Sequence, residues 1–526
     1  MDPVIVVGAG PVGLALSLAL ARHGVPSVVL DAGDGEVEQR AARTCVLRPD
    51  TAAHVSVLGG ARWAAWRTER RHQAVRRVDL DPAGSPVHIQ QYALERSLRA
   101  ALEREPLARV VPGARLEELE QDAHGVSART RGPGGTWWRG SHLVGCDGAR
   151  STVRKLLRIR FPGRTSVERH AVAALRVELP WDGEALLHRD LPGGGGEVVA
   201  RPLPNGVWRL DWLLPPRGDL VTPEELVARI RQTLSAWCDP VPPYELLDTG
   251  VHIAHQRLAR QWRSGRVFLA GDAARLLGAL GTQPVDEGLR DAVGLAWRLA
   301  LCRNGLAPEG LLDSYEAERR GAARARLRAL DQALPLVRGG GGLRTLLPGG
   351  SRGALDLLTD AHLGRGPLGG PPRYGDSPLT PGRDTVPGAV SVGTEPGSPV
   401  DDVPVTALDG SRGRLWQRLG RELLVLLVAP GTHVWDSRHW LSAGLMPELA
   451  AAVGRLPVPA GLLVTESYAG AAPHTVLVVR PDGHLVAALP AARSGELRAC
   501  AEAIRGVGAV GPDGPGECSG DRVDGP

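Results

Sequence analysis

The fold is decided by residues 4–31, which read VIVVGAGPVGLALSLALARHGVPSVVLD. Val4–Val7 is a short, wholly apolar run, which is typical of a strand buried on both faces. Leu14–His23 continues with the pattern of a helix, and Ser27–Leu30 is a second apolar run. The stretch therefore predicts a β-α-β unit of roughly 30 residues, the context in which a glycine-rich turn forms a dinucleotide site.

The turn between the first strand and the helix has the spacing G-x-G-x-x-G. Gly8 permits a tight turn, Gly10 lets the backbone approach a pyrophosphate, and Gly13 lets the helix pack on the strand. The anion is then bound by free amides at the positive end of the helix. Asp31, at the end of the second strand, can accept hydrogen bonds from a ribose diol. The residues predicted to surround the diphosphate are Gly8, Gly10, Pro11, Val12 and Gly13.

Length and composition narrow the class of protein. A chain of 526 residues predicts two or three domains. The formal charge of +4 is small and spread along the chain, which argues against a nucleic-acid partner. No run approaches the ~18–20 apolar residues of a membrane span, so no membrane association is expected. The six cysteines include no CxxC pair, which argues against a zinc site and favours a reducing cytoplasm.

Three later segments distinguish FAD from NAD as the dinucleotide. They read CDGARSTVR at 146–154, GRVFLAGDAA at 265–274 and DAVGLAWRL at 291–299. In sequence, order and spacing they resemble the DG motif, the GD motif and the following helix of the class A flavoprotein monooxygenases, the aromatic-hydroxylase family. The resemblance covers roughly residues 1–330.

The resemblance assigns roles to further residues. Asp272, with Gly271 before it, would accept hydrogen bonds from the ribityl chain of FAD, and Asp147 would shape the pyrophosphate region and assist NAD(P)H binding. Arg43 and Gln91 fall where the family has an arginine and a glutamine close to the cofactor. Each residue also has a structural interpretation: the two aspartates could cap a helix or end a strand, and Arg43 and Gln91 could be surface residues.

Residues 275–288 depart from the family, which usually has a histidine, a Pro-Pro pair, Gly-Gly-Gln-Gly and an asparagine here; this chain reads RLLGALGTQPVDEG. Pro284 replaces a glycine and has no amide to offer a ligand. Val285 follows, and Asp286 stands at the asparagine position. An ionised Asp286 at ~4 Å from an anionic reduced flavin would cost about 4 kcal/mol at an effective dielectric of 20. Alternatively, Asp286 points away and caps the helix that starts at Glu287.

These observations predict an α/β protein. A Rossmann-like FAD-binding domain is expected over residues 1–170 and 252–336, with an antiparallel-sheet substrate domain inserted at 171–251. Residues 337–385 are rich in Gly, Pro and Ser and predict a linker, and 506–526 predict a disordered tail. Residues 386–505 resemble the thioredoxin-like α/β domain of the polyketide- and phenol-hydroxylase branch. This domain lacks CxxC, so a structural or oligomerisation role is expected, for example in a homodimer.

The activity implied by the resemblance is that of a monooxygenase. NADPH or NADH would reduce FAD, and one atom of O₂ would pass to an aromatic, phenolic or polyketide-like molecule. Two alternatives remain open: an FAD enzyme of altered chemistry, such as oxidation, rearrangement or cyclisation, and a flavin-binding scaffold without turnover. No catalytic base stands out, although His170, His188 and His252 lie in or beside the expected substrate domain.

Overall fold

The computed structural model describes residues 2–55, 59–71, 73–131, 135–191, 196–215, 221–280, 284–338, 350–382, 386–430, 445–491 and 493–506. The expected tail lies almost wholly outside these ranges. The chain forms two compact units. The first contains Met1–Ala300, Tyr315–Arg373 and Gly413–Arg421, and the second contains Leu301–Ser314, Tyr374–Arg412 and Glu422–Pro526.

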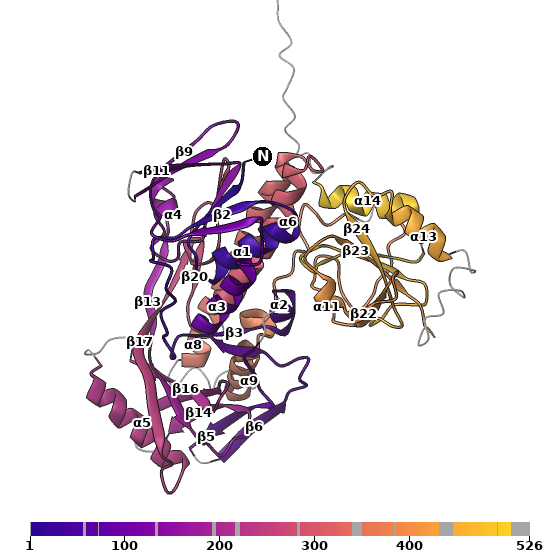
Figure 1. The fold of residues 1–526 in the computed structure, drawn as a ribbon. Coiled ribbons are helices and arrows are strands. Elements are labelled where there is room, and N and C mark those ends of the chain that lie inside the picture. Colours follow the sequence, from indigo (N-terminus) through magenta and orange to yellow (C-terminus); the bar gives the residue numbers. More distant parts are fainter. Residues whose placement is uncertain are drawn as a thin grey trace, which may run out of the picture. The chain divides into compact units, whose positions relative to one another are not determined.

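The β-α-β unit expected at the start of the chain is confirmed. It consists of β1 (Val4–Val7), α1 (Pro11–Arg22) and β2 (Ser27–Leu30) (Figure 1). The two strands are parallel and every residue in them is buried. Helix α1 packs against β2 and against α3 (Gln91–Leu102). The apolar runs therefore form strands covered on both faces, as their composition predicts.

The first sheet of the first unit has the order β18-β19-β12-β1-β2-β8. Strands β8 (Ala108–Val111), β12 (His142–Gly145) and β19 (Val267–Leu269) run parallel to their neighbours β2, β1 and β12, and only the edge strand β18 (Arg263–Ser264) is antiparallel. The chain leaves β1 on one side toward β2 and returns on the other side at β12. Because ligands of such sheets bind at the carboxyl ends of the strands beside this switch point, the glycine turn after β1 is correctly placed for one.

The second large sheet forms the expected substrate domain but is wider than predicted. Its strand order is β20-β17-β13-β16-β15-β14-β5-β6. The central strands lie close to the expected region: β13 (Gly163–Val177), β14 (Glu184–Leu191), β15 (Gly196–Pro202), β16 (Val207–Leu214) and β17 (Tyr244–Leu258).

Three strands from outside residues 171–251 complete this sheet, so the expected boundaries are too narrow. They are β5 (Ala65–Arg70), β6 (Gln73–Asp79) and β20 (Arg275–Leu277). Strand β5 pairs in parallel with β14, so the sheet is not wholly antiparallel. The physical reason is that β14 would otherwise present an open edge of unpaired amides and carbonyls.

Alternation along the strands gives this sheet two different faces. On one face, apolar side chains such as Leu210 and Trp212 pack against α5 (Pro223–Trp237), whose Leu226, Ile230 and Leu234 are buried among them. Helix α5 begins with a capping box, in which Thr222 and Glu225 satisfy each other's backbone amides. The opposite face of the sheet is largely polar and is described below.

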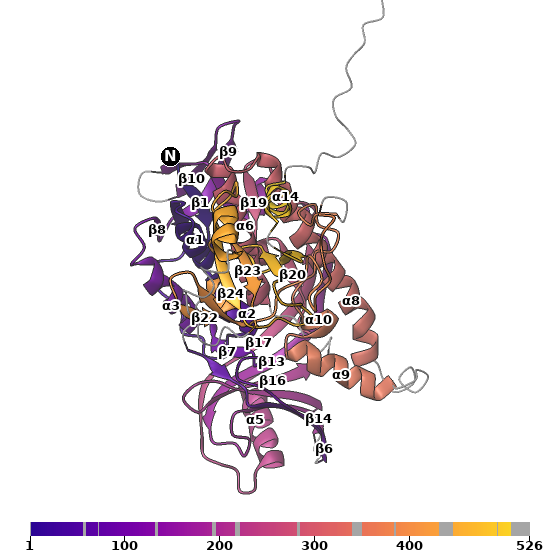
Figure 2. The ribbon, with the colours of Figure 1, turned by 90° about the vertical axis from the view of Figure 1, so that its right-hand side faces the viewer.

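The region expected as a linker contains ordered helices. Helices α9 (Gly350–His362) and α10 (Gly366–Gly369) lie beside α8 (Gly321–Arg338) in the first unit (Figure 2). Leu358 and Ala361 are fully buried in a cluster with Trp66. The abundance of glycine and proline therefore misled the expectation for this segment, because a short apolar helical stripe within it packs on the core.

The second unit contains a mixed six-stranded sheet with the order β22-β21-β24-β23-β25-β26. Strands β23 (Leu423–Val428) and β24 (Ala460–Thr465) are parallel, whereas β25 (Val476–Val479) and β26 (Leu485–Leu489) are added antiparallel. Helices α13 (Leu445–Val453) and α14 (Ser494–Ile504) pack on these strands. The second unit is thus an α/β structure, and the thioredoxin-like domain expected at 386–505 stays a prediction.

Other elements are short or follow the flavin motifs. They are β3 (Thr44–Leu47), α2 (Pro49–His54), β4 (Ala61–Arg62), β7 (Val87–Gln90), β9 (Arg115–Gln121), β10 (Val126–Arg131), β11 (Thr136–Gly140), α4 (Thr152–Leu156), η1 (Gly271–Ala273), α6 (Pro284–Arg303), η2 (Glu309–Leu312), α7 (Asp313–Tyr315), η3 (Glu316–Arg320), β21 (Pro404–Ala407), β22 (Arg412–Arg414) and α11 (Leu415–Arg418). Over the ranges given above, no helix is both long and apolar enough to cross a bilayer.

The packing of α5 on the sheet leads to a stability prediction. Ile230 is fully buried, so Ile230→Ala should lower the free energy of unfolding by about 2–5 kcal/mol through lost burial and a residual cavity. Ile253→Ala is the matched control, because Ile253 lies on β17 of the same sheet and is 43% exposed; its cost should be about 0.5 kcal/mol or less. Denaturant unfolding measures both, and equal effects would contradict this account of the core.

Candidate functional site

The three glycines of the first turn play two different structural parts. Gly8 has a φ of +103°, and a Cβ added there would lie 2.7 Å from the Cys146 carbonyl oxygen. A Cβ added at Gly13 would lie 2.0 Å from the carbonyl oxygen of Gly8. These two positions therefore allow the turn to close against β12 and α1. At Gly10, by contrast, an added Cβ would have no neighbouring atom within 4 Å.

The open space at Gly10 adjoins the start of α1. Gly10 is the N-cap residue and provides no side-chain cap, and Pro11 occupies the first turn. At this turn, the Leu14 backbone amide donates a helical hydrogen bond to the Gly10 carbonyl oxygen at 3.1 Å. A helix start with this arrangement presents amides and positive dipole charge to an anion. The residues thus fit the diphosphate of a dinucleotide, and a side chain at position 10 would fill its place.

Val12 serves mainly to pack the turn against the later motifs. A Cβ added at Gly271 would lie 3.0 Å from Val12 Cγ2, and one added at Gly288 would lie 2.4 Å from the same atom. The side chain of Val12 therefore sits against the GD motif and α6. This contact brings residues 271 and 288 next to the glycine turn.

Asp31 lies beside the turn, as expected. Its carboxylate accepts hydrogen bonds from the Ala9 amide at 3.1 Å and the Gly33 amide at 3.3 Å. The side chain is partly exposed. It can therefore brace the turn and still offer lone pairs to a ribose.

The side chain of Asp147 makes the contacts of a structural residue, and its expected part in NAD(P)H binding stays a prediction. Its carboxylate accepts from the Ser151 hydroxyl at 2.6 Å and from the amides of Thr152 and Val153 at 2.6 and 3.0 Å, which caps α4. Its backbone lies against Gly8. Asp147 thus shapes the turn through its main chain while its side chain holds α4.

Arg154 joins the DG motif to the GD motif, a role that its position in the sequence did not reveal. Its guanidinium donates to the carbonyl oxygens of Ala273 and Ala149, both at 2.8 Å, and lies over the Phe161 ring at 3.9 Å from the centroid. The only sequence signal for it was its place within the motif at 146–154.

Gly271 and Asp272 form the GD turn. Gly271 has a φ of +62°, and its amide donates to Asp291 Oδ2 at 2.9 Å. The side chain of Asp272 lines the wall of a cavity. The protein atoms around this cavity desolvate the carboxyl group, which raises its pKa against the opposing effects of Arg275 and Arg43. No side-chain cap is found on the short η1 helix that contains it. Its placement fits a carboxylate that receives hydroxyl groups of a ligand better than it fits a helix cap.

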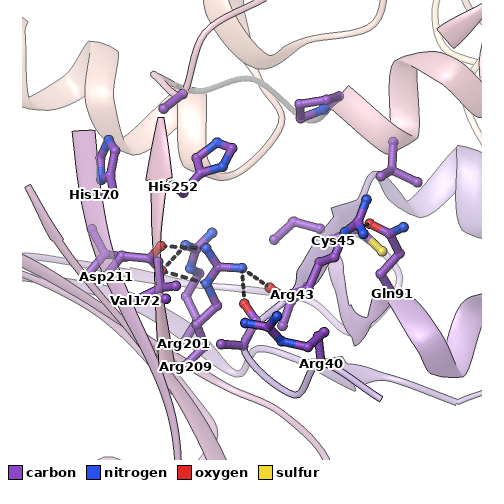
Figure 3. Close-up of a pocket in the computed structure, with 18 of the residues that line it drawn as sticks. Arg40, Arg43, Cys45, Gln91, His170, Val172, Arg201, Arg209, Asp211 and His252 are labelled. Atoms are coloured by element: carbon purple, nitrogen blue, oxygen red, sulfur yellow. Dashed lines mark hydrogen bonds and ion pairs between the residues drawn. The ribbon is translucent and has the colours of Figure 1, made fainter. Parts of the chain in front are cut away.

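A cavity of about 520 Å³ lies in the first unit between the flavin motifs and the second sheet. Five of the residues expected at the cofactor line it: Arg43, Gln91, Asp272, Pro284 and Val285. Arg43 Nε donates to Gln91 Oε1 at 3.0 Å, and the two side chains lie side by side (Figure 3). The Gln91 backbone amide donates to the Arg43 carbonyl oxygen at 2.9 Å. Segments that are far apart in the sequence therefore form one wall.

The second sheet forms the opposite wall. Every second residue of three strands faces the cavity: His170 and Val172 on β13, Glu197, Val199 and Arg201 on β15, and Arg209, Asp211 and Leu213 on β16. His252 on β17 lies directly across from His170 in the register, and both line the cavity. Burial, followed by Arg209, lowers the pKa of His252. His188 does not join them, since it is buried and accepts from the Trp237 indole N–H at 2.9 Å.

Asp286 points away from the cavity, in agreement with the second of its two expected placements, but it does not act as a simple helix cap. Helix α6 begins in the described residues at Pro284. The Asp286 carboxylate is fully buried, accepts from the Arg48 amide at 2.7 Å and forms an ion pair with the Arg48 guanidinium. Burial raises its pKa against the effects of Arg48 and Arg290. The charge of the Asp286 carboxylate is therefore directed to Arg48 and not to the cavity in which the flavin is expected.

Comparison with known proteins agrees with this geometry. Residues 1–329 match the family described as "FAD binding domain", and the chain belongs to that family. It is 33% identical over 345 residues to rifampicin monooxygenase of Streptomyces venezuelae, which covers 61% of this chain and 68% of that protein. It is 30% identical over 346 residues to the 3-(3-hydroxy-phenyl)propionate/3-hydroxycinnamic acid hydroxylase of Mycolicibacterium smegmatis, covering 61% of this chain and 59% of the hydroxylase.

A solved structure extends the likeness to almost the whole chain. It is a ternary complex of aklavinone-11 hydroxylase with FAD and aklavinone, with a TM-score of 0.72 and 24% identity, and the match covers 96% of this chain and 98% of that one. At this identity the match supports the fold. The expected architecture, a Rossmann-like FAD-binding domain with a substrate domain, is thereby confirmed.

The glycine turn generates a prediction with two arms. Gly10→Val should abolish retention of FAD while the chain still folds, because the new side chain meets open space that the diphosphate needs. Gly13→Ala should instead destabilise the fold, because its methyl group would overlap the Gly8 carbonyl. Flavin absorbance after gel filtration and circular dichroism measure the two effects.

Gly321→Val is the matched control for the first arm. Gly321 also has open space around an added Cβ, but it lies at the start of α8, away from the turn. Normal flavin content in Gly10→Val would reject this placement of the diphosphate.

Arg48 generates a second prediction. Its guanidinium is buried and holds Asp286, Glu287 and the Gly369 carbonyl oxygen. Arg48→Met should cost about 3–5 kcal/mol of unfolding free energy, because it leaves buried carboxylates without their partner. Loss of Arg48 also raises the pKa of Asp286 further, so the deficit should shrink as the pH falls and Asp286 is protonated.

Arg70→Met is the control for this change, since Arg70 forms an exposed ion pair with Asp190 and should have a far smaller effect. Urea unfolding at several pH values measures both variants. A deficit in Arg48→Met that is independent of pH would show that packing rather than charge is at work.

Proposed function

We propose that this chain is an NAD(P)H-dependent flavoprotein monooxygenase acting on an aromatic or polyketide-type small molecule. The proposed reaction consumes substrate–H, O₂, NAD(P)H and a proton and yields substrate–OH, water and NAD(P)⁺. The observation that carries the proposal is the cavity. One of its walls consists of flavin-motif residues, and the other consists of strands of the second large sheet, called the substrate sheet below. The hydroxylases and the monooxygenase to which the chain is similar support it.

In this proposal the protein binds and orients both molecules. The amides that open α1 bind the diphosphate, and Asp31 binds the ribose. Asp272 binds the ribityl chain of FAD, and Arg43 and Gln91 lie next to Asp272 on the same wall of the cavity. FAD, when bound, supplies the acceptor for hydride and the chemistry of O₂. The substrate sheet covers the cavity and limits the access of water.

Pro284 and Val285 complete the flavin side of the cavity. Proline at the start of a helix is tolerated because its missing N–H has no partner within the helix there. The same residue favours a second candidate function, an FAD enzyme of altered chemistry such as oxidation or cyclisation, since it removes an amide from the loop beside the flavin. A flavin-binding scaffold without turnover is the third candidate.

Reduction and reoxidation separate these candidates. The full chain loaded with FAD should bleach under anaerobic NADPH or NADH in the presence of aromatic compounds, and its colour should return in air. A chain that holds FAD but is inert to both nicotinamides would refute the monooxygenase and favour the other two. A chain that takes up no FAD would refute both enzyme functions.

Asp272 provides a test of the cofactor site. Asp272→Ala should weaken FAD binding roughly tenfold to a hundredfold, because hydrogen bonds to a charged acceptor contribute about 1.5–3 kcal/mol. Asp182→Ala, at an exposed turn, is the control. Titration of the flavin-free chain with FAD measures the affinities, and equal values would remove Asp272 from the site.

Two further proposals concern the setting of the enzyme. We place it in a reducing cytoplasm, a choice supported by the described cysteines Cys45, Cys146, Cys238, Cys302 and Cys500, none of which forms a disulfide. The homodimer stays a prediction that the molar mass in solution tests.

A further inference from the structure

Two arginines stand directly opposite each other on the cavity side of the substrate sheet. Arg201 on β15 and Arg209 on β16 are register partners, and the side chains of both line the cavity (Figure 3). Like charges on directly opposed residues destabilise an antiparallel pair. Their presence here therefore calls for a negative charge to offset them.

One carboxylate serves both arginines. Asp211 accepts from Arg209 Nε at 3.0 Å and Nη2 at 2.7 Å, and it also pairs with Arg201. Burial alone would raise the pKa of Asp211, but Arg209 and Arg201 lower it far below its usual range, so Asp211 is a carboxylate at neutral pH. Within the described part of the chain, these are the ion pairs found for the two arginines. The cluster therefore carries one surplus positive charge.

Of the other acidic residues that line the cavity, Asp272 lies on the opposite wall with the flavin motifs, and the remaining three are paired elsewhere. Glu38 and Asp248 pair with Arg40 at 3.6 and 3.2 Å, and Glu197 pairs with Arg189 at 3.2 Å. They therefore do not neutralise the surplus charge of the arginine cluster.

The surplus charge is concentrated on Arg201. Arg209 is fully engaged, since its Nη1 also donates to Ala42 O at 2.7 Å and Thr44 Oγ1 at 2.9 Å. His88 Nε2 lies 2.8 Å from the same Thr44 hydroxyl and keeps this arrangement in place. In Arg201, by contrast, one Nη atom binds Asp211 and the buried Nε has no hydrogen-bond partner in the described residues.

We propose that Arg201 binds an anionic oxygen of the substrate, a carboxylate or a phenolate, and so fixes which end of the substrate faces the sheet. This inference rests on the proposed function. A second anionic group would bring two arginines and one aspartate to neutrality, and a planar guanidinium is well suited to bind a carboxylate. The opposite end of the molecule then lies toward the wall of Arg43, Gln91 and Asp272, where the flavin is expected.

The test compares matched acids and neutral analogues on the full chain loaded with FAD. The first pair of probes is 3-(3-hydroxyphenyl)propionate and its amide, which differ only in the charge of the side chain. The second pair is 3-phenylpropionate, which has only the acid, and 3-ethylphenol, which has only the phenol. Binding is followed by the change in flavin absorbance and checked by calorimetry.

If the bound anion is a carboxylate, the wild-type chain should bind the acid at least tenfold more tightly than the amide, and Arg201→Met should abolish this preference. Asp211→Asn should change it in the opposite direction and strengthen acid binding, because it removes the competing carboxylate. A residue with a merely structural role would not give these opposite shifts. Arg176→Met is the control, since Arg176 lies on β13 of the same sheet, is exposed and pairs with Glu245.

The second pair of probes identifies the source of the anion. A selective loss of 3-phenylpropionate binding in Arg201→Met assigns a carboxylate, whereas a selective loss of 3-ethylphenol binding assigns a phenolate. An Arg201→Met chain that keeps both its preference for the acid over the amide and its affinity for 3-ethylphenol would overturn the proposal, as would a wild-type chain that binds none of the four probes. So would a change in FAD affinity or flavin reduction alone, because Arg201 would then serve the cofactor.

The outcome for FAD keeps the two proposals distinguishable. Failure of the wild-type chain to take up FAD or to be reduced refutes the proposed function. Normal FAD uptake and reduction, combined with binding of both the acid and 3-ethylphenol that does not depend on Arg201, refutes only this inference.

Discussion

The close approach of the glycine turn to its neighbours is the constraint on which the rest of the first unit depends. A Cβ at Gly8 would collide with the backbone directly after β12, and a Cβ at Gly13 would collide with the Gly8 carbonyl oxygen. Val12 is wedged against two further glycines, one in the GD motif and one in α6. None of these contacts tolerates a larger residue without a shift. Three segments separated by more than a hundred residues are thereby brought to one edge of the parallel sheet, where a dinucleotide site can form.

A buried ionic network supports this arrangement from the other side. Glu287 and Asp291 on α6 bind Arg319, and Asp291 also pairs with Arg275, next to the GD motif. Arg48, at the start of α2, joins this network through its ion pair with Glu287 and also donates to the Gly369 carbonyl oxygen. Buried ion pairs contribute little net stability, but breaking one leaves an uncompensated charge. The network therefore acts less as a source of stability than as a constraint that makes alternative placements of α6 costly.

The fold of the flavin domain could be predicted because local signals determine it. Runs such as Val4–Val7 and His142–Gly145 form the expected strands, and the glycine turn lies where its spacing indicated. The wall formed by Arg43, Gln91 and Asp272 could be inferred only through the resemblance to a family. Its members meet through tertiary packing, which no local pattern encodes.

The remaining features could not be read from the sequence for the same reason. The burial of Asp286 depends on Arg48, which is 238 residues away in the chain. The cluster of Arg201, Arg209 and Asp211 follows from strand register, which sequence alternation leaves undefined across strands. Helix α9 was missed because glycine and proline around it concealed a short apolar stripe.

The parallel pairing of β5 with β14 has a consequence for chimeric enzymes. Since residues 65–79 complete the edge of a sheet whose other strands come from 163–277, the roof of the cavity is not a contiguous cassette. A graft that exchanged only the later segment between relatives would join strands from two evolutionary backgrounds along one ladder of hydrogen bonds. An exchange of this sheet between relatives must therefore carry both segments together to keep the pairing of β5 with β14 intact.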